Sequence, residues 1–321
     1  STDDTYFNPS GGINLTHHFN ERLRFRSRTN MAYEQEPDYD YGLATDRRVG
    51  QYFRYSSDNS LGYRWTERFG TVTGYRISGA TYDDVDNEDY MNHTFYNQFR
   101  YRTSPVTVLT ASYRYAISDN DVGGNNDSQY FLVGAEHEFS PNTVGVIRVG
   151  AQYYSPDIGD SNWSPYLEST LRTRVNEKFG LRAFVYYGLE GRQNGIWTHD
   201  CNAVAPIPTA PATLVYFEQR HLLRIGTQGS YDVSPTLTIF GGANLVYENY
   251  EDGYNLGPVL PVGSSASDFD EVIYNLNIGA SYRVLENVYL TGSYNYSHSS
   301  SDSDLREYDR NRVQLGVQTT F

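Results

Sequence analysis

The chain has 321 residues, a mass of 36.6 kDa and a net charge of −14, with 38% hydrophobic and 15% aromatic residues. Its 31 tyrosines and 15 phenylalanines argue against an acidic disordered chain, and its charge argues against a nucleic-acid partner held by phosphate contacts. No stretch contains the roughly 20 consecutive apolar residues that a transmembrane helix needs, and the single Cys201 excludes an intrachain disulfide framework.

An alternation with a period of two begins near the N-terminus and recurs along the chain. In residues 22–33, Leu23 and Phe25 share one parity, whereas Arg24 and Arg26 share the other. This period is typical of a β-strand whose two faces meet different environments, and no segment shows a convincing helical period. The sequence therefore predicts an all-β chain. In chain order, the predicted strands cover residues 11–19, 22–36, 47–65, 69–83, 90–103, 106–118, 129–139, 143–154, 163–175, 179–190, 215–232, 236–249, 271–284, 288–298 and 308–321.

The connections between these strands alternate between two kinds. Short turns are predicted at residues 20–22, 66–68, 104–105, 140–142, 176–178, 234–236 and 285–287. Longer, polar and acidic connections are predicted at 37–46, 83–89, 118–128, 155–162, 191–214, 250–270 and 299–307. Short turns at one end and long loops at the other are typical of an outer-membrane β-barrel. We therefore predict a single domain, residues 1–321, that forms an antiparallel up-and-down transmembrane β-barrel integral to the bacterial outer membrane.

The predicted strand count is odd. Fifteen strands are visible, whereas bacterial single-chain barrels have an even number with both termini on the short-turn side. The strand that begins near Gly11 starts on the long-loop side, and the residues before it read as an acidic loop. We expect a further strand upstream of Ser1, which gives sixteen strands in the complete barrel.

In the predicted barrel the apolar parity of each strand faces lipid, and the other parity lines the lumen. An outward Arg would cost about 2–4 kcal/mol at the bilayer midplane, so most of the arginines are assigned inward. They outnumber the inward acids, and two interpretations follow: Arg–Glu and Arg–Tyr ladders brace the barrel, or the Arg rows favour anionic solutes. The pore-lining candidates are Arg24, Arg26, Arg28, Arg54, Arg64, Arg76, Arg100, Arg114, Arg148, Arg172, Arg182, Arg220, Arg224, Arg312, Glu136, Glu168 and Glu218.

Signs of catalytic or metal chemistry are weak. No histidine lies in a recognisable hydrolase or zinc motif, and His17, His93, His137 and His221 fall on the lipid-facing parity. The loop at 119–127 is rich in oxygen ligands but lacks the bidentate Glu of an EF-hand, so a solvated turn is favoured. We expect no catalytic residue, no metal and no cofactor.

The longest internal connection, residues 191–214, contains an apolar, proline-rich run. Proline keeps such a segment extended and out of the sheet. It either packs against a surface partner or a second copy of the chain, folds into the barrel mouth, or is an ordinary surface loop. Cys201 within it is a free thiol, a modification point or an intermolecular link, and the sequence does not choose between these.

The last predicted strand alternates Val313, Leu315 and Val317 around Gly316, and the chain ends in Phe321. This pattern resembles the C-terminal signal strand of bacterial outer-membrane proteins, and the resemblance implies the barrel-assembly machinery as a partner.

The segment Asp3-Asp-Thr-Tyr-Phe7, followed by residues 9–15, resembles an early segment of the putative β-barrel porin 2 family of Gram-negative bacteria. The resemblance covers most of the chain as architecture, and it transfers no catalytic residues. It implies a channel in the outer membrane for passive diffusion of small polar or anionic solutes. The alternatives are a structural or adhesive surface protein that displays acidic loops to a partner and, third, an outer-membrane hydrolase.

Overall fold

The computed structural model describes residues 9–34, 52–83, 89–121, 125–157, 160–190, 196–198, 213–255, 268–302 and 307–319. The strands are β1 (Ser10–His18), β2 (Leu23–Glu34), β3 (Tyr52–Arg64), β4 (Phe69–Tyr82), β5 (Tyr90–Ser104), β6 (Thr107–Asn120), β7 (Asn126–Ser140), β8 (Thr143–Pro156), β9 (Asn162–Arg174), β10 (Phe179–Glu190), β11 (Ile196–Thr198), β12 (Thr213–Ser234), β13 (Leu237–Asn255), β14 (Phe269–Leu285), β15 (Val288–Ser301) and β16 (Tyr308–Thr319). No helix in this described part is long and apolar enough to cross a membrane. The predicted all-β class and all fifteen predicted strands are confirmed.

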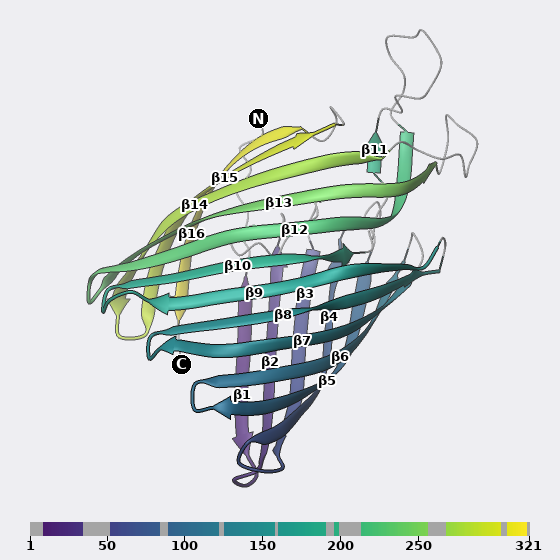
Figure 1. The fold of residues 1–321 in the computed structure, drawn as a ribbon. Coiled ribbons are helices and arrows are strands. Elements are labelled where there is room, and N and C mark those ends of the chain that lie inside the picture. Colours follow the sequence, from purple (N-terminus) through teal and green to yellow (C-terminus); the bar gives the residue numbers. More distant parts are fainter. Residues whose placement is uncertain are drawn as a thin grey trace.

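These strands form one antiparallel up-and-down sheet in which each long strand pairs with the next along the chain. The short β11 lies off this path, pairs with β12, and falls inside the segment that we predicted as a connection. The sheet curls around one interior, with short turns at one end and longer connections at the other (Figure 1). β1 and β16 form the edges of the described sheet, and both run from the long-connection end toward the short-turn end.

Turn chemistry explains why the short connections are short. The Asn20 side chain accepts hydrogen bonds from the backbone N–H groups of Arg22 and Leu23, both at 2.8 Å. Asn176 makes the same two bonds at the turn before β10, and Thr66 closes the turn before β4 through its hydroxyl. These side chains replace backbone partners within the turn, which is the reason that Asn and Thr favour such positions. The seven predicted short turns are all confirmed.

The outward face of the sheet carries exposed apolar side chains, as the alternation predicts. Leu61, Val133 and Ile225 are 46–59% exposed within their strands. Exposed aromatic residues flank this band at the short-turn end, among them Trp65 and Phe139. Exposure of such a large apolar surface to water is unfavourable, so the outward face requires an apolar environment.

The concave face also contains a small apolar cluster, which the alternation did not predict. Leu222, Val246 and Ile273 are 0–1% exposed on β12, β13 and β14, and Tyr186 of β10 packs against them. The assignment of the apolar parity to the lipid therefore does not describe this part of the face, where the inward parity is apolar as well. The sequence does indicate this cluster through apolar residues at consecutive positions, such as Leu222 and Leu223. Such pairs show that both faces of the strand are apolar there.

β9 separates from β10 toward the long-connection end. Their pairing stops at Leu167 and Tyr187, whereas β10 continues to pair with β12 as far as Glu190. Pro165 of β9 has no N–H group to donate at this position. Here the buried Gln152 side chain, reaching from β8, bonds both the N–H and the C=O of Leu189. A side-chain amide thus replaces the missing strand partner.

Candidate functional site

The predicted pore-lining residues lie on the parity that faces the concave side of the sheet. Most of them belong to three ion-pair groups or to one arginine-rich cavity, which are described in turn. Arg54, Arg172, Arg182 and Arg312 lie outside the three ion-pair groups, and the side chain of Glu218 lies outside the described residues.

The first group spans β5 to β9 and alternates in charge. Arg100 binds Glu136 through two hydrogen bonds of 2.6 and 2.7 Å, and Arg148 lies 3.8 Å from the same carboxylate. Arg148 also binds Glu168 at 2.7 Å, and Arg114 binds Glu168 at 3.2 Å. Arg100 is on β5 and Glu136 is on β7, so this pair crosses the intervening β6. The small Thr110 and Gly134 occupy the register positions between Arg100 and Arg148 and leave room for the crossing side chains.

The second group lies on β10, β12 and β13 and is buried at its centre, whereas the Glu190 side chain is partly exposed. Arg220 contacts Glu190 and Glu248, each at 3.3 Å, and Arg224 contacts Glu190 at 3.5 Å. Arg220 is 2% exposed and Glu248 is 0% exposed, with the Tyr250 hydroxyl donating to the Glu248 carboxylate. A buried charge persists only when it is paired, so these residues connect neighbouring strands at a fixed register.

The third group is a smaller one on β3 to β5. Asp58 accepts a hydrogen bond from the Arg76 Nε at 3.0 Å and another from the Tyr96 hydroxyl at 2.7 Å. Arg76 comes from the adjacent β4, whereas Tyr96 reaches from β5 across Gly74 of β4. The negative charge of Asp58 is therefore already compensated by Arg76. Tyr96 belongs to this group too, although the sequence analysis did not name it as a site residue.

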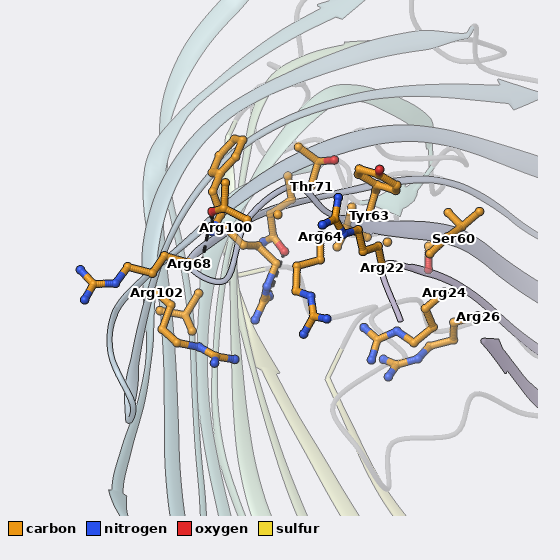
Figure 2. A pocket seen from close by; sticks show the side chains of 18 of the residues that line it. Arg22, Arg24, Arg26, Ser60, Tyr63, Arg64, Arg68, Thr71, Arg100 and Arg102 are labelled. Atoms are coloured by element: carbon orange, nitrogen blue, oxygen red, sulfur yellow. Dashed lines mark hydrogen bonds between the residues drawn. The ribbon is translucent and has the colours of Figure 1, made fainter. Parts of the chain in front are cut away.

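A cavity of about 740 Å³ opens on the concave face at the short-turn end of β2 to β5, and Arg148 of β8 also lines it. Figure 2 shows the guanidinium groups of Arg24, Arg26, Arg64 and Arg102 reaching the same open space, whereas Arg68 points away from it. The predicted candidates Arg28 and Arg100 line the cavity too. The turn arginines Arg22 and Arg68 were not predicted as lining residues because they lie outside the alternating strands.

Gly62 makes space for this cluster. It faces Arg24 across the β2–β3 ladder, and a Cβ atom at this position would lie 4.0 Å from the Arg24 Nη2 atom. Ser60 faces Arg26 in the same way. The surface beneath the arginines thus consists of small residues, which leaves the guanidinium groups directed into the open space.

The outward face carries a repeated arrangement that we call the Tyr–His–acid arrays. In the first array the Tyr75 hydroxyl lies 2.7 Å from His93 Nδ1, and His93 Nε2 lies 3.7 Å from Asp119. The second array consists of Tyr187, His221 and Glu251, with distances of 3.3 and 3.8 Å. A third consists of Tyr274, His298 and Asp309, with ring centroids 6.2 Å apart and an imidazole–carboxylate distance of 3.0 Å. All three lie toward the long-connection end of their strands.

Metal ligands do not gather in the described part of the chain: no three His, Cys, Asp or Glu side chains there could hold an ion together. Of the predicted assembly signal, Val313, Leu315 and Val317 are 68–87% exposed on the outward face of the edge strand β16. Gly316 lies between Leu315 and Val317, whereas Phe321 lies outside the described residues, as does Cys201.

Comparisons with solved structures find distant likenesses. The siderophore receptor PirA from Pseudomonas aeruginosa is 11% identical, with a TM-score of 0.41 over 92% of this chain and 63% of that chain. The copper transporter OprC is 12% identical, with a TM-score of 0.47 over 98% and 66%. The ferric preacinetobactin receptor BauA from Acinetobacter baumannii is 10% identical, with a TM-score of 0.49 over 97% and 58%. This chain therefore spans less than two thirds of the length of each.

A comparison with curated protein sequences found no match. A family model described as "Outer membrane protein beta-barrel domain" matches residues 133–321, which is more than half of the chain. The match begins within β7 and includes the second ion-pair group and the edge strand β16. The chain belongs to this outer membrane β-barrel family and is an integral protein of the bacterial outer membrane, with its outward face embedded in the lipid bilayer.

Proposed function

We propose that the protein is an outer-membrane channel through which small polar solutes diffuse passively, with a preference for anions. The observation that carries the proposal is the surplus of arginine on the concave face. Three ion-pair groups hold Asp58, Glu136, Glu168, Glu190 and Glu248 of that face, and the arginines that line the cavity remain in excess of the acids that line it. Rings of Arg side chains favour anions in a pore, because their fixed positive charge raises the local anion concentration.

The proposal includes no chemical step. The histidines of the Tyr–His–acid arrays face outward, away from the solute path. The resemblance to porins in the early segment 3–15 supports diffusion through an open lumen. The names of the similar solved structures describe receptors and a transporter for other solutes, and their likeness to this chain concerns the fold.

Planar bilayer recording tests the proposal, with the full chain refolded in detergent micelles and then inserted into the bilayer. We expect step-like conductance increments in KCl and, in a tenfold KCl gradient, a reversal potential of the sign that corresponds to chloride selectivity. A silent protein at every salt concentration would refute a channel. A cation-selective reversal potential would refute the role of the arginine surplus while leaving the channel in place.

A second candidate is a structural or adhesive surface protein. The observation that favours it is the bracing of the concave face: Glu168 is shared by Arg114 and Arg148, and the apolar cluster Leu222, Val246 and Ile273 is fully buried. Such packing covers part of the concave face of β10 to β14 with apolar side chains. The same recordings distinguish the two candidates, because a barrel filled with side chains conducts no ions.

A further inference from the structure

The cavity at the short-turn end of β2 to β5 differs from the rest of the concave face in its charge balance. Nine of its lining residues are arginines, and four are acids. Of the acids, Asp58 is held by Arg76 and Tyr96, and Glu136 is held by Arg100. Glu21 and Glu67 lie on the exposed turns. The cavity therefore has more positive charge than its own acids neutralise.

Four guanidinium groups account for this excess. Among the described residues, no carboxylate lies within ion-pair distance of Arg24, Arg26, Arg64 or Arg102. They come from β2, β3 and β5 and reach the same space (Figure 2). Like charges that converge repel one another, so a site of this kind is stabilised by an anion that lies between them.

The size and the donors of the cavity indicate the class of anion. A volume of about 740 Å³ is within the range of small-molecule sites and is far larger than a chloride ion. Each guanidinium group presents parallel N–H donors that match two oxygens of one phosphate. The four groups come from β2, β3 and β5, and β2 and β5 are separated by three strand spacings of about 4.8 Å each, so the donors are spread over more than the width of one phosphate group. A solute with at least two phosphate groups fits them better.

The position of the cavity identifies the source of the phosphate. The four arginine side chains face the concave side, whereas the bilayer contacts the opposite, outward face. A lipid headgroup would have to leave the bilayer surface to reach them. The ligand is therefore expected from the aqueous interior.

We propose that this cavity is a binding site for a soluble solute that carries two or more phosphate groups, held by Arg24, Arg26, Arg64 and Arg102. The site makes the channel selective by saturable binding, which goes beyond a general anion preference. This inference rests on the proposed function for its role in transport, although binding itself is measurable without any current.

Isothermal titration of inorganic pyrophosphate into the full chain in detergent micelles tests the site. At low salt we expect saturable heat, tighter binding of pyrophosphate than of orthophosphate, and weakening as KCl screens the charges. The triple variant Arg24→Gln, Arg64→Gln, Arg102→Gln should bind pyrophosphate at least about tenfold more weakly, because charge-assisted hydrogen bonds are lost. The matched control is Arg172→Gln. Arg172 lies on β9, on the same face and near the short-turn end, but outside the cavity, so this variant should retain the affinity for pyrophosphate.

Three results would overturn the site: no saturable heat, equal binding by the triple variant, or orthophosphate bound as tightly as pyrophosphate. If circular dichroism shows that the triple variant has lost its β-structure, the single variants Arg64→Gln and Arg64→Lys take its place. Lys keeps the charge and loses the fork, so it should bind with intermediate affinity. Conductance recorded on the same samples separates the two proposals, because pyrophosphate binding without current refutes the channel alone, and current without binding refutes the site alone.

Discussion

At the scale of single residues, Gln152 shows how one side chain maintains a strand that has lost its neighbour. Its amide is fully buried, bonds both backbone groups of Leu189, and lies 3.2 Å from the Tyr130 hydroxyl. The side chain crosses β9 near its long-connection end. Its register partner there is Ser164, which is itself buried. The curvature of the sheet between β8 and β10 is thereby fixed at one point.

We predict that Gln152→Leu destabilises the protein. Leucine fills the same space but leaves the Leu189 N–H and C=O groups buried without partners, at a cost of about 1–3 kcal/mol each. Urea unfolding of the refolded protein in micelles measures the change. The control is Gln129→Leu, because Gln129 lies on the exposed outward parity of β7 and accepts one bond from Tyr113. Equal stabilities of the two variants would contradict the role of Gln152.

The sequence predicted the face of almost every strand residue but few of the partners. Alternation places Arg100 and Glu136 on one face, yet their pairing across β6 depends on the absence of bulk at Thr110 and Gly134. The bond from Gln152 to a backbone two strands away depends on where β9 leaves β10, and Pro165 is a weak signal of that. Contacts between strands that are not adjacent depend on the curvature of the sheet. The alternation within a single strand carries no information about that curvature.

At the scale of elements, β12 is the strand that best reports depth in the bilayer. His221 lies at the level of the second Tyr–His–acid array, near the long-connection end, and Ile225 lies four residues further toward the short turn. Four residues of strand cover about 13 Å, enough to pass from the membrane interface toward the middle of the bilayer. The arrays then lie where polar headgroups meet the hydrocarbon.

We predict that arginine is tolerated at His221 and not at Ile225. His221→Arg should cost at most about 1 kcal/mol, and Ile225→Arg should cost about 2–4 kcal/mol, because the penalty for a lipid-facing arginine falls toward the interface. Urea unfolding in lipid vesicles gives both values on one strand, each variant acting as the control for the other. A larger destabilisation by His221→Arg than by Ile225→Arg would contradict the assignment, because it would place the arrays in the hydrocarbon layer.

Element boundaries were less predictable than element existence. β13 extends to Asn255, beyond the predicted end at 249, because polar residues continue a strand outside the bilayer as readily as they form a loop. The three-residue β11 was missed within the segment 191–214, since three residues are too few to show a period. Its ladder partner is the start of β12, which also begins earlier than predicted.

At the scale of the whole molecule, the order of the fifteen long strands in the described part of the chain could be predicted because sequential hairpins leave no choice of neighbour. Each short turn joins two antiparallel strands, so the turns alone specify the path that the sheet follows. The odd number of long strands makes the edge strands β1 and β16 run in the same direction. The uneven distribution of charge along the interior was less predictable, because it depends on which arginines find acids.

The arginine cavity at the short-turn end has a consequence for the electric field along the channel axis. The connections at the opposite end are acidic in sequence, as in Asp83-Asp-Val-Asp-Asn-Glu-Asp89. The cavity and these connections therefore carry opposite charge, which gives the β2 to β5 side of the channel a dipole along its axis. A channel with this dipole should rectify: in symmetric KCl, currents at equal positive and negative voltages should differ, and raising the salt should abolish the difference by screening. A linear current–voltage relation at low salt would show that the two ends cancel in the field that a permeating ion experiences.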